Sequence, residues 1–328
     1  MVESSGKVTL WAIEIFLATA DEGAISAAAR RVGASSSAVS QQLSSLETAL
    51  GAVLLDRSTR PVSLTPAGAM FRRRALVILN EAEQARVELA SSDFSTLTRF
   101  RIGIIEDFDA DVTPALLSEM ASDLSDCQFL LETGASHKLN DLLDSRALDV
   151  IVAADMGAAA DWMEVHPLME EPFIVAVPRG VVKQGLEGAA FINALGNLPL
   201  IQYTPRHVMG RQISAHLAQQ NLRLSHRFEL DSYHAIMSMV SQGAGWSILT
   251  PLGFLRAQRF HDGVDLFPLP FAPLSRTISL YARRDVLGEI PAQVACRLRN
   301  LLQRVTIDQA RQHMPWLGDQ QRILEPKC

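Results

Sequence analysis

Between residues 25 and 50, apolar side chains recur at helical spacing, and a turn interrupts them. Ala28, Ala29 and Val32 share one face of a short first segment. Gly33 then allows a turn, because glycine adopts backbone angles that a side chain disfavours. Beyond it, spacings of 4, 3 and 4 place four residues on one stripe, which predicts a second helix that ends at Gly51: Val39, Leu43, Leu46 and Leu50.

The opposite stripe of the second helix carries only short polar side chains and an amide. These are Ser36, Ser37, Ser40, Gln41 and Ser44. Ser26 and Ser35 are expected to cap the two helices and are further candidates for DNA contact. In a major groove, Gln can bond adenine with two hydrogen bonds, and Ser can reach base edges or phosphates. An ordinary amphipathic surface helix would show the same periodicity, so the stripe alone leaves both interpretations open.

The flanking segments favour DNA binding. Residues 53–65 (VLLDRSTRPVSLT) predict a short hairpin that directs Arg57 and Arg60 from its tip toward phosphate or the minor groove. Residues 8–21 predict a supporting helix, with Trp11, Ile15 and Ala18 among its inward positions. Three helices and a hairpin of this kind would form an all-α winged helix-turn-helix domain over residues 1–64.

The runs AAARRVGASSSAVSQQLSSLE and LLDRSTRPVSLTPAG resemble the winged helix-turn-helix of LysR-type transcriptional regulators. The resemblance is close from Val8 to about Leu89 and looser beyond. The sequence departs from the family's pattern in two places: many members carry Gln-Pro where this chain has Ser36-Ser37, and Arg where it has Gln41. The base preference of relatives therefore does not transfer to this chain.

Thr65 and Pro66 predict the start of a long linker helix over residues 65–91, with Thr as the cap and Pro in the first turn. Its apolar residues follow a heptad pattern, which favours a dimer seam: Phe71, Ala75, Ile78, Ala82, Ala85 and Leu89. A helix buried against its own domain is the alternative. The polar residues 92–98 are expected to form a hinge.

From residue 99 onward, apolar strands alternate with helices, which predicts an α/β domain whose parallel sheet is covered on both faces. The order resembles the effector-binding domain of the same family, which implies two Rossmann-like, periplasmic-binding-protein-like lobes over 99–308. Lobe I would comprise about 99–162 and 275–308, and lobe II about 163–274. Residues 309–328 form an extension that packs locally or extends an interface; the sequence does not decide which.

The composition of the chain limits the classes of protein to which it can belong. The chain has 328 residues, a hydrophobic content of 48% and a net charge of −6, yet residues 1–90 hold as many basic as acidic side chains. No segment is long and apolar enough to span a bilayer, and no signal peptide is evident, so the sequence predicts a cytoplasmic protein without a membrane partner. Cys127, Cys296 and Cys328 lie far apart, which argues against a disulfide framework and a zinc site.

Enzyme signatures are missing from the sequence. It contains no GxSxG elbow, no GxxxxGK[ST] loop and no HExxH pair, so no catalytic residue, metal ligand or cofactor is predicted. Candidate effector contacts instead come from the ends of strands, where ligands bind in α/β sheets. They are Glu106, Asp107, Phe108, Ser136, Asp155, Tyr203, Thr204, His207 and Trp246.

The sequence therefore predicts a DNA-binding transcription regulator that is controlled by a small organic acid or amino acid. The resemblance implies a homodimer, or a homotetramer of two dimers, bound to an imperfect inverted repeat in promoter DNA. RNA polymerase is a further candidate partner. The alternative is a solute-binding or catalytic α/β protein whose N-terminal helices only mediate protein contacts.

Overall fold

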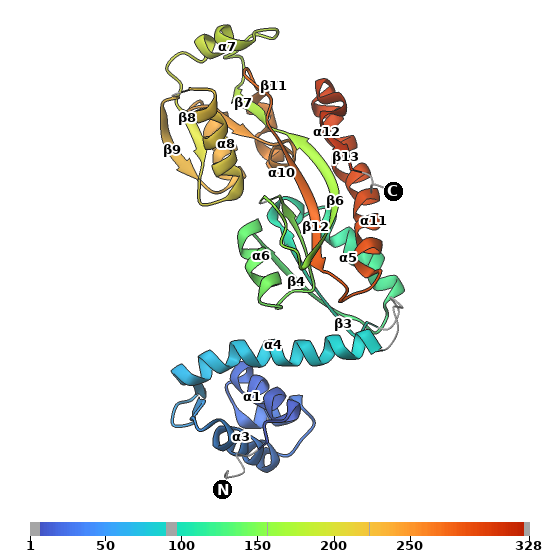
Figure 1. Cartoon of the computed structure of the whole chain (residues 1–328). Coiled ribbons are helices and arrows are strands. Elements are labelled where there is room, and N and C mark those ends of the chain that lie inside the picture. Colours follow the sequence, from blue (N-terminus) through green and yellow to red (C-terminus); the bar gives the residue numbers. More distant parts are fainter. Residues whose placement is uncertain (1–6, 90–96, 156, 223, 325–328) are drawn as a thin grey trace. The chain divides into compact units, whose positions relative to one another are not determined.

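A computed structural model describes residues 7–89, 97–155, 157–222 and 224–324 (Figure 1). The chain divides into two compact units. The first consists of residues 1–91 with 145–147, and the second of residues 92–144 with 148–328. Most of the expected hinge, residues 92–96, lies outside the described residues. No helix within the described ranges is long and apolar enough to cross a membrane.

The first unit is the predicted winged helix-turn-helix followed by a long helix. Gly23, Gly33 and Gly51 all adopt positive φ angles at the turns and helix ends of this unit. Its elements are α1 (Leu10–Glu22), α2 (Ile25–Arg31), α3 (Ser36–Leu50), β1 (Leu55–Asp56), β2 (Ser63–Leu64) and α4 (Pro66–Leu89).

Three expectations for this unit are wrong. The cap of α2 is Ala24, without a side-chain hydrogen bond, and Ser26 lies inside the first turn. Trp11 is 42% exposed and Leu50 is 37% exposed. Helix α1 (LWAIEIFLATADE) is apolar on nearly every side, so spacing could not decide which face is buried. Leu50 is the last residue of α3 and lies beyond the buried stripe, which ends at Leu46.

Helix α4 uses part of its apolar stripe within its own unit. The Phe71 ring lies 5.2 Å from that of Phe16, and Ala75 is fully buried. Ile78, in contrast, is 39% exposed. Ala82 is half-buried and Ala85 is exposed, while the side chain of Leu89 lies outside the described residues. The stripe therefore divides between a buried N-terminal part and a more exposed later part.

The first lobe of the second unit contains a six-stranded sheet in the order β13-β6-β12-β5-β3-β4. The strands β3 (Arg99–Ile105), β4 (Gln128–Gly134) and β5 (Val150–Ala154) are parallel, as predicted. The expectation of a wholly parallel sheet is wrong, because β12 (Ser275–Arg283) pairs antiparallel with both β5 and β6 (Met163–Pro172). Three helices flank this sheet: α5 (Val112–Asp123), α6 (Ser136–Asp144) and α11 (Ile290–Leu302).

The second lobe combines an antiparallel sheet with a parallel pair of strands. The sheet has the order β10-β7-β11, from β10 (Ser247–Leu249), β7 (Ile174–Pro178) and β11 (Val264–Pro268). The parallel pair is β8 (Leu200–Tyr203) and β9 (His226–Leu230). The helices are α7 (Gly188–Leu195), α8 (Val208–Gln219), α9 (Tyr233–Ser241) and α10 (Pro251–Arg256), followed by the 3-10 turn η3 (Gln258–Gly263).

Two paired strands join the lobes. β6 and β12 run side by side and lead into the second lobe (Figure 1). Where the chain passes into that lobe, the Phe173 backbone N–H donates to the Leu274 carbonyl over 2.8 Å. The junction is thus an antiparallel ladder, with one register shift between Ile278 and Ser279.

The segment after α11 packs locally and reaches both lobes. It continues through a π-helical turn (Gln303–Ile307), α12 (Asp308–His313) and the 3-10 segment η5 (Pro315–Gln320). Ala310, Met314 and Leu317 are fully buried in the core of the second lobe. The last strand, β13 (Arg322–Ile323), pairs with β6 in the first lobe.

Glu47 holds the hairpin of the first unit against α3. Its Oε1 accepts from the backbone N–H groups of Leu54 and Leu55 at 2.8 and 3.1 Å, and its Oε2 lies 2.7 Å from the Arg57 guanidinium. We expect Glu47→Ala to lower the free energy of unfolding of this unit by about 1–3 kcal/mol, because two backbone donors lose their acceptor. Thermal unfolding of the full chain measures this.

Glu47→Gln is the matched control. It keeps the acceptor for both backbone N–H groups and loses only the half-exposed ion pair with Arg57, which is worth about 0–1 kcal/mol. Equal losses from the two substitutions would show that the backbone hydrogen bonds contribute nothing.

Candidate functional site

The polar face of α3 is exposed and rests on a buried stripe. Val39, Leu43 and Leu46 are at most 1% exposed. Ser35 caps the helix as predicted, since its Oγ accepts from the Ala38 backbone N–H at 3.2 Å. The packing therefore fixes which side of α3 faces outward.

Some side chains on the polar face of α3 form hydrogen bonds within the chain, and others do not. Ser44 donates back to the Ser40 carbonyl, and the Ser37 hydroxyl lies 3.0 Å from that of Ser35. Within the described part of the chain, no side-chain hydrogen bond engages Ser36 or Gln41. These two exposed side chains therefore keep their hydrogen-bonding capacity for another molecule.

The two arginines of the hairpin differ. Arg57 forms an ion pair with Glu47 on α3, whereas Arg60 is exposed and forms no salt bridge among the described residues. The expectation that both guanidinium groups extend from the tip is wrong for Arg57, because a carboxylate on the neighbouring helix holds it. Further along, Arg72 pairs with Asp21 over 2.9 Å.

A pocket lies between the two lobes of the second unit and encloses about 420 Å³, including its open mouth. Five of the nine predicted effector residues line it: Glu106, Asp107, Ser136, Tyr203 and His207. They come together because β3, β4 and β8 all end at this cleft, as expected for the carboxyl ends of strands.

The other four predicted residues have different positions. Phe108 and Trp246 are buried in the core, at 1% and 2% exposure. Thr204 is also buried, and its hydroxyl donates to Glu229 over 2.7 Å. Asp155 borders a neighbouring open cavity, which shares Val208 and Arg276 with the pocket. The geometry therefore does not support Phe108, Trp246 and Thr204 as effector contacts.

Two helices begin at the pocket, one from each lobe. Gly134, Ala135 and Ser136 line it at the start of α6, and His207, Val208 and Met209 at the start of α8. The Ser136 hydroxyl accepts from the Ala154 backbone N–H, and α8 has no side-chain cap. Backbone N–H groups in a first helical turn lack partners within the helix and carry partial positive charge.

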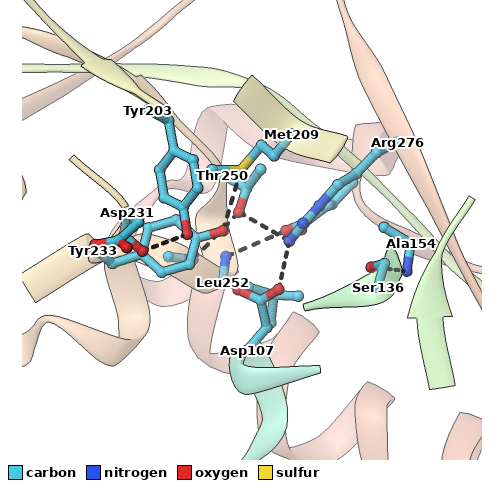
Figure 2. A network of polar contacts seen from close by, with 12 residues as sticks. Asp107, Ser136, Ala154, Tyr203, Met209, Asp231, Tyr233, Thr250, Leu252 and Arg276 are labelled. Atoms are coloured by element: carbon cyan, nitrogen blue, oxygen red, sulfur yellow. Dashed lines mark hydrogen bonds and ion pairs between the residues drawn. The ribbon is translucent and has the colours of Figure 1, made fainter. Parts of the chain in front are cut away.

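Arg276 was missed by the sequence reasoning, although it anchors the pocket (Figure 2). Its Nε donates to Glu171 over 2.8 Å, and one terminal nitrogen lies 3.2 Å from Asp107 and 3.3 Å from the Thr250 hydroxyl. Glu171 also accepts from the Leu252 backbone N–H. A buried guanidinium thus joins β12, β6, the end of β3 and the start of α10.

Arg276 and Glu171 are direct neighbours across the β12–β6 ladder. Nothing in the local sequence reveals the pair, because the two residues are 105 positions apart and the strand β6 was not predicted. An arginine at the start of the apolar run TISLYAR was the one available signal.

Aromatic side chains form the second-lobe wall of the pocket. The rings of Tyr203 and Tyr233 lie 5.3 Å apart, and that of His207 lies 5.7 Å from Tyr203. Burial, with the nearby Asp107 carboxylate, raises the pKa of both tyrosines well above its usual range. Burial and the neighbouring His137 lower the pKa of His207, which keeps it neutral at pH 7.

Comparison with known families matches both units. Residues 10–69 match the model of the bacterial regulatory helix-turn-helix protein, lysR family, and residues 96–299 match the LysR substrate binding domain. A hydrogen peroxide-inducible genes activator of Pectobacterium carotovorum is 27% identical over 83% of this chain and 89% of its own length.

Solved structures show the same fold. A full-length OxyR variant from Pseudomonas aeruginosa is 23% identical with a TM-score of 0.64, and covers 89% of this chain and 95% of that one. The full-length regulator CbnR in complex with its target DNA is 18% identical with a TM-score of 0.61, and covers 90% and 100%.

The buried ion network predicts a large effect of removing its cation. Arg276→Met would leave Glu171, which is fully buried, and Asp107 without their shared partner. We expect a loss of about 3–5 kcal/mol in the free energy of unfolding of the second unit, measured by thermal or denaturant unfolding.

Arg322→Met provides the matched control, since Arg322 pairs with Glu170 at the adjacent, more exposed position of β6. Its loss should stay below about 1 kcal/mol. The double variant of Arg276→Met with Glu171→Gln should recover part of the larger loss. Similar small losses for Arg276→Met and Arg322→Met would contradict a central role for the network.

Proposed function

Because the chain belongs to the LysR family of DNA-binding transcription regulators, we propose that α3 contacts promoter bases and that a small molecule in the interlobe pocket controls the regulator. The observation that carries the DNA-binding part is the exposed polar face of α3, whose Ser36 and Gln41 side chains have no internal partner within the described ranges. The family match supports DNA as the partner, and the exposed geometry of α3 supports the choice of residues.

Gln41 is the main candidate for base contact. Its amide offers a donor and an acceptor together, which is the pattern that pairs with the major-groove edge of adenine. Ser36 and Ser40 can add contacts to base edges or phosphates. Ser35, Ser37 and Ser44 bond within the helix, so we assign them to shaping α3.

Arg60 is the candidate for phosphate contact from the hairpin. It is exposed and free of carboxylate partners in the described part of the chain, whereas Arg57 is held by Glu47. Arg57 then acts on DNA binding by keeping the hairpin in place.

The two contact types predict different losses. Gln41→Ala should weaken binding to the preferred promoter site by about 1–3 kcal/mol and leave binding to random DNA unchanged. Arg60→Ala should weaken binding to both DNAs and reduce the dependence of log K on log salt by about one unit. Fluorescence anisotropy titrations at several salt concentrations measure both, and a uniform loss for Gln41→Ala would refute base contact.

We further propose that α4 dimerises the regulator through its later, more exposed part, from Ile78 onward. Phe71 and Ala75 are occupied within their own unit, which leaves Ile78, Ala82 and Ala85 for a partner copy. Close pairing of small residues would also place two α3 helices on one promoter, as expected for an inverted repeat. A tetramer of two such dimers remains part of the proposal.

Ile78→Asp should abolish the dimer and specific promoter binding, since it puts an unpaired charge into an apolar contact. Sedimentation measures the assembly, and circular dichroism checks that the chain still folds. Leu76→Asp is the control, because Leu76 is 47% exposed and lies outside the heptad pattern. An intact dimer in Ile78→Asp would show that α4 is not the interface.

The effector is proposed to be a small organic or amino acid that binds reversibly. Relatives named for peroxide induction suggest thiol oxidation as the other mode of control. None of the residues that line the pocket is a cysteine. Burial and the nearby Asp149 raise the pKa of Cys127, which disfavours the reactive thiolate.

A further inference from the structure

The pocket carries an excess of negative charge. Glu106 is exposed at its lining and forms no ion pair among the described residues. Asp107 and Glu171 share the single guanidinium of Arg276. The lowered pKa of His207 leaves that ring uncharged at neutral pH. At this end of the pocket, three carboxylates therefore lie around the single guanidinium of Arg276.

One carboxylate oxygen of Asp107 accepts no hydrogen bond from the described residues. Its side chain is 8% exposed, its Oδ2 lies 3.2 Å from Arg276, and its Oδ1 is buried without a hydrogen-bond partner. Figure 2 shows the carboxylate pointing up between Arg276 and the ring of Tyr233, away from η2 (Glu106–Phe108). A buried carboxylate oxygen without a donor is unfavourable, so the site favours a ligand that brings one.

The other side of the pocket has the opposite polarity. The N-termini of α6 and α8 both border it, and Lys138 adds positive charge beside His207. Such a pair of helix N-termini favours a negatively charged ligand group. The rings of Tyr203 and Tyr233 lie between these regions and offer an apolar face that also accepts a cation.

We propose that the effector carries a cationic nitrogen that donates to Asp107 and Glu106, with a carboxylate directed at the starts of α6 and α8. The effector is thus an amino acid or a close amine-bearing relative, and a plain carboxylic acid is excluded. This inference rests on the proposed function and specifies its ligand. The nitrogen binds Oδ1 of Asp107 while Oδ2 keeps Arg276, so binding leaves the junction between the lobes intact.

The test is a binding screen with the full chain. The probes are the common proteinogenic amino acids, the amines formed by their decarboxylation and the acids that lack their amino group. Thermal shift identifies ligands, because stabilisation grows with ligand concentration relative to Kd. Isothermal titration then measures Kd for each stabilising compound and for its matched amine and acid.

We expect the stabilising compounds to carry an amine, and the matched acids to bind at least about tenfold more weakly. Glu106→Gln should weaken the amine-bearing ligands about tenfold. Glu132→Gln removes another exposed carboxylate, on β4 and outside the pocket, and should leave the Kd unchanged. Asp107→Asn adds a second comparison at the buried position.

Three results would overturn the inference. They are acids that bind as tightly as the amino acids from which they differ only by the amino group, an unchanged Kd in Glu106→Gln, or no binding by any amine-bearing probe. Promoter binding is measured separately by anisotropy in the same preparation. A chain that binds its promoter but prefers plain acids refutes only the inference about the effector. One that binds amino acids but no promoter DNA refutes only the proposed function.

Discussion

A guanidinium enclosed by protein must have its charge balanced, and this requirement organises the second unit. Arg276 is 5% exposed, and Glu171 opposite it is fully buried. Each needs the other, since an isolated buried charge would cost several kcal/mol. Their pairing fixes the register of β6 and β12 where these strands join the lobes. Thr250 and Leu252 tie α10 to the same charges, and Asp107 brings in the end of β3.

In the first unit, a single carboxylate with several donors has a similar structural role. One carboxylate, Glu47, accepts two backbone N–H groups of the hairpin and an arginine from its tip. The apolar stripe of α3 fixes which face is presented, and Glu47 fixes where the hairpin lies beside it. Arg57 is held by Glu47, whereas Arg60 forms no salt bridge among the described residues, although the sequence makes the two arginines look equivalent.

What the sequence predicts well is what depends on local spacing. The buried stripe of α3, its end at Gly51 and the parallel strands β3, β4 and β5 all follow from patterns of a few residues. Strand ends also located Glu106, Asp107, Ser136, Tyr203 and His207, because parallel strands place their carboxyl ends on one edge. A residue's position after a strand does not reveal where its side chain points, however. Phe108 and Thr204 are buried in the core.

Long-range pairing lies beyond such patterns. Arg276 finds Glu171 only because β6 forms, and the sequence of β6 (MEVHPLMEEP) mixes charges and prolines in a way that hides a strand. Trp11 shows the reverse difficulty, since α1 is so uniformly apolar that its exposed side carries a large ring. In both cases, residues distant in sequence determine the outcome: whether β6 forms a strand, and which face of α1 is buried.

The C-terminal elements of the second unit impose an order on folding during biosynthesis. The core of the second lobe includes Ala310, Met314 and Leu317, and the edge of the first-lobe sheet is covered by β13. A ribosome makes these residues after all the others in the two lobes, so neither lobe can reach its final packing while the chain is still growing. The hydrophobic core of the first unit uses only residues up to α4 and can form early. The nascent protein thus acquires its helix-turn-helix well before it acquires a sensor.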